Sequence, residues 1–187
     1  MLKLVKRIIL HLIYFLQSKS IYQKIGRKWV SQITYIQANE TQLEKYAEWI
    51  FPKQEMRFEP AEEKRKYIIA LNKKNKYVGS VMIQKYFNEP NVEYCILYSL
   101  KIQLKYRRLG IGNKLTLEAM QLAKKLGYSE LFLSTSEQNI KAQKLYESIG
   151  FKQISYNSLI PFYKAVIDSY PNKTMLAFLY NLSKLKA

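Results

Sequence analysis

The chain has 187 residues, a length that suits one domain with an extension, and its 48% hydrophobic content predicts a folded globule rather than disorder. Its 31 Lys and Arg residues outnumber 14 Asp and Glu residues, and this net charge of +17 fits an acidic partner, an anionic cofactor or a general compositional bias of a chain rich in Lys, Ile, Asn and Tyr. A lone cysteine, Cys95, excludes an internal disulfide, and a lone histidine, His11, argues against a zinc site or a Ser-His-Asp hydrolase.

Residues 1–30 are basic and amphipathic. No Asp or Glu precedes Glu40. On a helix, the apolar residues of the first 16 positions would fill one half of the surface. The charge-free stretch is too short to span a membrane. We therefore expect a helical extension over residues 1–30, which either lies on an anionic membrane surface through residues 1–18 or packs against protein.

The next segments, up to residue 102, alternate strand and helix signals. Asn39 is a helix N-cap candidate, and the turn at residues 72–76 separates two strand-like runs typical of a hairpin. The expected elements are a strand at 33–36, a helix after Asn39 that ends before Pro52, helical turns at 61–66, hairpin strands at 67–71 and 77–87, and a strand at 92–102.

Residues 107–112 read Arg-Arg-Leu-Gly-Ile-Gly and lie between that last strand and a helical period over 113–126. A glycine-containing loop that opens a helix leaves several backbone N–H groups unpaired, and the helix dipole adds positive charge there. Gly110 and Gly112 let the backbone approach a ligand without an intervening Cβ atom. The pattern predicts an anion site suited to a diphosphate, with Arg107 and Arg108 supplying charge.

A second pattern follows in residues 131–151. A short apolar strand at 131–135 precedes a helix over 136–151, which Gly150 ends. Asn139 and Tyr146 are seven residues apart, so a regular helix would place them on one face with the small Ala142 near the same stripe. Final strands are expected at 152–156 and 175–180, separated by a loop that contains Pro161 and Pro171.

Arg107-x-x-Gly110-x-Gly112, followed by Asn139, Ala142, Tyr146 and Gly150-Phe151, resembles the GNAT superfamily of acyl-CoA-dependent N-acyltransferases. The resemblance is strong over residues 92–152 and extends more weakly, in element order, over 31–181. It implies an α+β fold over residues 31–187, with a mixed, mostly antiparallel sheet flanked by helices. One departure is visible, because the family often has Val-x-Pro where this chain has Ile102-Gln103-Leu104.

The resemblance also implies acetyl-CoA as co-substrate, no metal, and direct attack of a primary amine on the thioester. Tyr146 would protonate the departing CoA thiolate. Glu93 is a candidate general base, with Glu55 and Glu59 as alternatives. The expected cofactor-binding residues are Leu100, Ile102, Arg107, Arg108, Leu109, Gly110, Ile111, Gly112, Asn113, Asn139 and Tyr146.

Other functions stay open at this point. The chain could transfer a longer acyl group, or bind acyl-CoA at a membrane surface without catalysis. A nucleic-acid partner is disfavoured because no reader motif accompanies the charge. We expect the acceptor to be a small-molecule or peptide amine, and the protein to be a monomer or a homodimer. We expect a cytoplasmic location, peripheral to the inner membrane face if the extension binds lipid.

Overall fold

The computed structural model describes residues 31–51, 65–89, 92–170 and 174–185. The expected extension over residues 1–30, and the candidate bases Glu55 and Glu59, lie outside the described residues. Within the described residues, no helix combines the length and the apolar character needed to cross a membrane.

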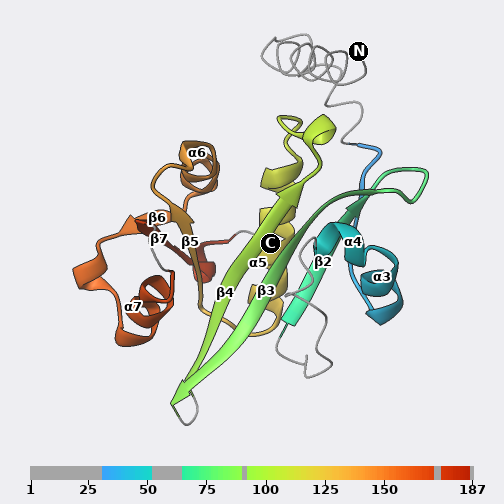
Figure 1. The fold of residues 1–187 in the computed structure, drawn as a ribbon. Helices are drawn as coiled ribbons and strands as arrows, with labels where there is room; N and C mark the ends of the chain where they lie inside the picture. Colours follow the sequence, from blue (N-terminus) through green and yellow to red (C-terminus); the bar gives the residue numbers. More distant parts are fainter. Residues whose placement is uncertain (1–30, 52–64, 90–91, 171–173, 186–187) are drawn as a thin grey trace.

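Seven strands form one sheet in the order β1-β2-β3-β4-β5-β7-β6 (Figure 1). Neighbouring strands pair in antiparallel fashion except β4 and β5, which are parallel. The expected mixed, mostly antiparallel sheet is therefore confirmed. The strands are β1 Thr34–Gln37, β2 Arg65–Leu71, β3 Tyr77–Glu89, β4 Val92–Ile102, β5 Glu130–Ser136, β6 Lys152–Ile154 and β7 Met175–Asn181.

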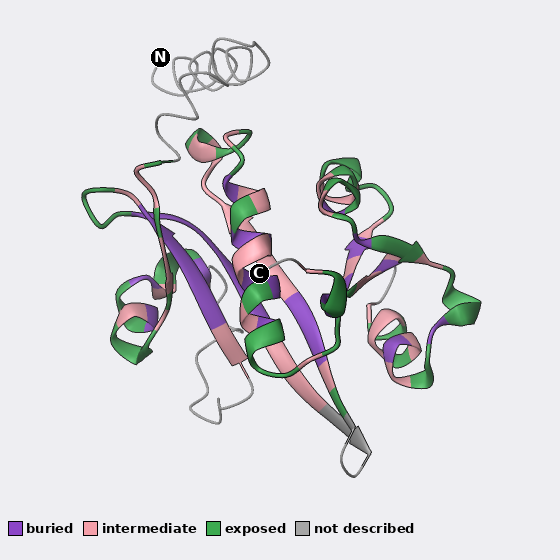
Figure 2. Cartoon of the chain, turned by 180° about the vertical axis from the view of Figure 1, so that it is seen from behind, coloured by how far each residue is buried: buried purple, intermediate pink, exposed green. Residues whose placement is uncertain are grey.

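Helices cover both faces of the sheet. On one face, α5 (Ile111–Lys125) and α6 (Ile140–Ile149) enclose the largest apolar cluster, which includes Leu115, Met120 and Phe178. On the other face, α3 (Glu40–Lys45) and α4 (Ala47–Ile50) cover β2 and β3, while α7 (Pro161–Asp168) covers β5 and β7. Figure 2 shows the buried strand residues beneath α5.

The sheet opens between β4 and β5. The register pairs these strands at Ile96 and Phe132, and no further pair is recorded between them in the described chain. On its other side, β4 has a bulge, because one residue of β3 faces two residues of β4 between the pairs Met82–Tyr98 and Ser80–Lys101. Ser99 in this bulge has a left-handed backbone, with φ of 52°. The carboxyl end of β4 is therefore bent, and its β5 side carries no recorded strand partner.

Three expected elements differ from the structure in type or continuity, and the helix expected over residues 136–151 begins only at Ile140. Arg65 and Lys66, assigned to helical turns, begin β2. The helix after Asn39 is interrupted at Tyr46, which separates α3 from α4. The expected loop around Pro161 instead contains α7. Pro161 is compatible with the first turn of this helix, because an N–H group there has no helical hydrogen-bond partner.

Candidate active site

An open cleft of about 1600 Å³ lies at the carboxyl end of β4. Its walls come from the end of β4, the loop over residues 103–110, the first turn of α5, one side of α6, and the edge formed by α4 and the start of β3. The lining residues are Trp49, Tyr77, Leu100, Lys101, Ile102, Gln103, Leu104, Lys105, Tyr106, Arg107, Arg108, Gly110, Gly112, Asn113, Asn139, Ile140, Lys141, Ala142, Lys144, Leu145 and Ser148.

The first turn of α5 supplies bare backbone N–H groups to this cleft. Gly110 caps the helix with φ of 84°, a left-handed conformation that a side chain strains, and no side-chain cap is present. The first helical bond over this turn runs from Lys114 N to Gly110 O. The N–H groups of residues 111–113 therefore precede the helical ladder. Since the first turn also contains no acidic residue, the positive end of the dipole is available to an anion.

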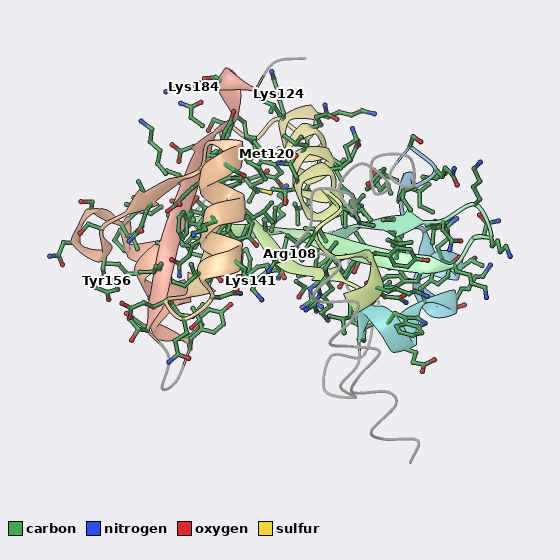
Figure 3. The ribbon with its side chains drawn as sticks, turned by 90° about the horizontal axis from the view of Figure 1, so that it is seen from above. Arg108, Met120, Lys124, Lys141, Tyr156 and Lys184 are labelled. Atoms are coloured by element: carbon green, nitrogen blue, oxygen red, sulfur yellow. The ribbon has the colours of Figure 1, made fainter. Side chains whose placement is uncertain are left out.

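Six basic side chains add positive charge to the cleft, and none of the described residues that line it is acidic. Arg108 from the loop before α5 and Lys141 from the first turn of α6 lie on either side of it (Figure 3). Arg107 donates from Nε to Ile102 O at 3.0 Å, which fixes the loop against the end of β4. Such a surface attracts an anionic ligand.

The wall formed by β4 includes a fixed lysine. Lys101 Nζ donates to Ile50 O at 2.7 Å, so the end of β4 is joined to the last residue of α4. Partial burial lowers the pKa of the Lys101 ammonium group. Close to this contact, the half-exposed Trp49 stacks on Tyr77 with ring centroids 6.0 Å apart.

Helix α6 presents Asn139 and Ala142 to the cleft but turns Tyr146 away. Asn139 is the N-cap, and its side chain accepts from Ala142 N at 3.3 Å. Tyr146 is 7% exposed, does not line the cleft, and contacts Phe151 and Phe178 in the core. Burial raises its pKa to about 12. Asn139 thus lines the cleft as expected, whereas the Tyr146 ring packs in the core and is not among the lining residues.

The position of Glu93 does not fit the role of general base. It is ion-paired with Lys85 and lines a separate small pocket with Leu126 and Tyr128. These two residues follow the carboxyl end of α5, whereas the cleft lies at its amino end. A helix of 15 residues is about 22 Å long. Glu93 is therefore too far away to take a proton from an acceptor bound in the cleft.

The structure brings most of the expected cofactor-binding residues together. Two exceptions besides Tyr146 are Leu109, which is half-buried and does not line the cleft, and Ile111, which is buried in the core and can contribute only through its backbone. Sequence reasoning missed several other lining residues. Trp49 and Tyr77 come from segments distant in the sequence, and Lys141 and Lys144 belong to no recognisable motif. The residues from the expected set that line the cleft are Leu100, Ile102, Arg107, Arg108, Gly110, Gly112, Asn113 and Asn139.

Comparisons with known proteins agree with this geometry. A family model described as Acetyltransferase (GNAT) family matches residues 30–151. N-acetyltransferase 8 from Homo sapiens is 39% identical over 57 residues, which cover 30% of this chain and 25% of that protein. The chain thus matches about a quarter of the length of this relative.

Solved structures share the fold. A GNAT family acetyltransferase from Elizabethkingia anophelis with acetyl-CoA bound aligns with a TM-score of 0.60 at 18% identity, covering 80% of this chain and 98% of that one. NAA60 from Arabidopsis thaliana, in complex with acetyl-CoA, aligns with a TM-score of 0.60 at 14% identity, covering 81% and 99%.

Proposed function

The chain belongs to the GNAT acetyltransferase family, and from this premise we propose that it is an N-acetyltransferase that moves an acetyl group from acetyl-CoA to a primary amine. The observation that carries the proposal is the uncapped first turn of α5 at Gly110, which opens into a cleft whose described charged lining residues are all basic. A diphosphate suits both features.

The cofactor would use two parts of the cleft. Its phosphates fit the N–H groups of residues 111–113 together with Arg107 and Arg108. Its pantetheine amides suit the free edge of β4 at Leu100 and Ile102, where backbone groups have no recorded partner on the β5 side. Bound acetyl-CoA in two structural neighbours supports this choice of ligand.

The proposed reaction is direct transfer. The amine nitrogen attacks the thioester carbonyl carbon, a C–N bond forms, the C–S bond breaks, and the thiolate takes a proton. None of the described residues that line the cleft is a carboxylate. Glu55 and Glu59 lie outside the described residues, and the openness of the cleft to solvent supports water as the group that takes the proton lost by the amine.

Tyr146 is the proposed proton donor to the thiolate. A tyrosine phenol is protonated at neutral pH even at its ordinary pKa near 10, so Tyr146 carries a proton that it can donate. It follows Ala142, which lines the cleft, by one helical turn. Because its side chain is buried, the thiol end of the co-substrate would have to enter between the diverging ends of β4 and β5 to receive the proton.

The burial of the Tyr146 side chain also favours a second candidate function. If the Tyr146 hydroxyl does not reach the thiolate, the protein could bind acyl-CoA without transferring the acyl group. A thiol-release assay with acetyl-CoA and a panel of amines separates the two functions. Release that depends on an added amine supports transfer, whereas binding of acetyl-CoA without release supports the non-catalytic function. Repeating the assay with longer acyl-CoA thioesters tests transfer of a longer chain.

A further inference from the structure

One basic residue that lines the cleft comes from the sheet itself. Lys101 lies in β4, between Leu100 and Ile102. Those two neighbours pack against the apolar cluster beneath α5 and α6, whereas Lys101 Nζ donates to Ile50 O at the end of α4. Because side chains alternate along a strand, the Lys101 ammonium group faces away from the helices that offer the phosphate site. The other basic residues that line the cleft come from the loop before α5 and from α6: Lys105, Arg107, Arg108, Lys141 and Lys144.

The position of Lys101 is fixed, and its charge has no counterpart among the described residues. A Cβ atom at Gly79 of β3 would lie 2.5 Å from Lys101 O, so the two strands approach closely here and hold the backbone. The ammonium group donates to the neutral Ile50 O at 2.7 Å and forms no ion pair with a described residue. Partial burial lowers the pKa of this group, an effect that a bound carboxylate would reverse.

An aromatic pair lies beside this ammonium group. Trp49 precedes Ile50, whose carbonyl group Lys101 contacts, and the Trp49 ring stacks on Tyr77. Both aromatic residues line the cleft together with Lys101, and Trp49 is 49% exposed. The pair therefore forms an apolar wall on which the carbon atoms of a ligand can lie. Such a wall strengthens a neighbouring ion pair, because it excludes water from one side.

Lys101 is also close to the proposed position of the thioester. The pantetheine is proposed at the free edge of β4, at Leu100 and Ile102, and successive residues of a strand are about 3.3 Å apart. A small acceptor whose amine reaches the thioester can therefore place a second group at the Lys101 side chain.

We propose that Lys101 selects amine acceptors that also carry a carboxylate, as a free amino acid or an acidic peptide does. This inference rests on the proposed function and names the class of its acceptor. The carboxylate pairs with the ammonium group, and the carbon atoms between carboxylate and amine lie against Trp49. A polyamine such as spermidine is a poor acceptor, because its additional positive charges meet a lining whose described charged residues are all basic.

The test measures thiol release from acetyl-CoA by the full-length chain with acceptors that differ only in carboxylate against amide. One pair is leucine and leucinamide, and the other is the peptide amides Ala-Glu-Ala and Ala-Gln-Ala, so that the two sources of a carboxylate are separated. Lys101→Met removes the charge at similar length, and Lys101→Arg keeps the charge. Lys144→Met is the matched control, because it removes the same charge from the α6 wall of the cleft. Circular dichroism checks that the variants fold.

We expect the acid-to-amide ratio of kcat/KM to fall about tenfold in Lys101→Met for at least one pair, since a hydrogen-bonded charge pair contributes about that factor. Comparing the ratio between variants cancels the difference in amine basicity between an acid and its amide. The ratio should stay within about threefold of the wild type in Lys101→Arg and Lys144→Met. An unchanged ratio in Lys101→Met, an equal fall in Lys144→Met, or better use of spermidine than of both carboxylate-bearing acceptors would overturn the proposal.

Calorimetric titration separates this inference from the proposed function, because it needs no turnover. The wild-type chain saturated with coenzyme A is titrated with N-acetylleucine, the product of transfer to leucine, with N-acetylleucinamide, and with the acetylated peptide pair. A preference of about tenfold for one acid over its amide is expected, and it decides the matter even if Lys101→Met fails to fold. This preference without thiol release from any amine would support the carboxylate site and contradict transfer. Thiol release without a preference for the acid in the titration would support transfer and overturn the inference.

Discussion

Ile96 of β4 and Phe132 of β5 are opposite each other in the parallel register, and beyond this pair the described parts of the two strands diverge. Both side chains are fully buried, so the pair anchors the two halves of the sheet. Toward the carboxyl ends, Ser99 bends β4, and the cleft opens beside Leu100. The ligand site is thus a consequence of where strand pairing ends.

The anion site should depend on Gly110. Gly110→Asp adds negative charge beside the bare N–H groups of α5, and we expect it to lower the affinity for acetyl-CoA by at least about tenfold. Gly127→Asp is the matched control, because Gly127 also has a positive φ, of 90°, and open space around it, but lies after the other end of α5. Calorimetric titration of both variants gives the answer. Equal loss of affinity in both would indicate strain rather than charge.

Tyr146→Phe should reduce kcat by about 100-fold with little change in KM for acetyl-CoA, since the variant removes only the proton donor. The ring remains to pack against Phe151, and no recorded hydrogen bond is lost, so thermal stability should change little. Tyr163→Phe provides the control, because Tyr163 is equally buried on the other face of the sheet. Steady-state kinetics of thiol release tests this, and an unchanged kcat in Tyr146→Phe would remove the residue from the mechanism.

The pH dependence follows from the proposal that the amine loses its proton to solvent water. For an alkylamine with a pKa near 10.4, the neutral fraction increases about tenfold with each unit by which the pH rises below that value. Tyr146, with its pKa raised to about 12, stays protonated over the same range. Values of kcat/KM for the amine should therefore rise continuously from pH 6 to pH 9. A plateau that begins near neutral pH would instead reveal a basic group on the enzyme.

Glu93→Gln should leave thiol release within about twofold of the wild type, because Glu93 lies at the end of β4 remote from the cleft. The partly exposed pair with Lys85 contributes little to stability, so the melting temperature should also change little. Rates and thermal melts of this variant are the measurements. A loss of two orders of magnitude in kcat would show that Glu93 acts in catalysis after all.

The bulge should tolerate glycine and reject a branched side chain. Ser99 has φ of 52°, where a β-branched residue is strained by about 1–3 kcal/mol, whereas glycine is not. We expect Ser99→Val to lower the melting temperature and the affinity for acetyl-CoA together. Ser99→Gly should preserve both. Identical behaviour of the two variants would mean that the left-handed backbone at this position is not needed.

Elements with strong local signals could be predicted from the sequence. The strand over residues 92–102 was predicted with the bounds that β4 has, and Gly150 adopts the left-handed conformation expected of a helix C-cap. These features depend on hydrophobic pattern and on glycine, which act within a few residues.

Features set by tertiary packing could not be predicted. The bulge at Ser99 has no glycine to mark it, and its position is set by the register between β3 and β4. The burial of the Tyr146 ring depends on its packing against the aromatic neighbours Phe151 and Phe178. The contact between Lys101 and Ile50 joins residues 51 positions apart, which no local pattern encodes.

The account is tested most directly by calorimetric titration of the full-length protein with acetyl-CoA and with coenzyme A at low and moderate salt. We predict saturable binding of both ligands at one site per chain, weakened by added salt because the cleft recognises phosphate through backbone N–H groups and basic side chains. Absence of saturable binding for both ligands at micromolar to millimolar concentration would contradict the assignment of the cleft.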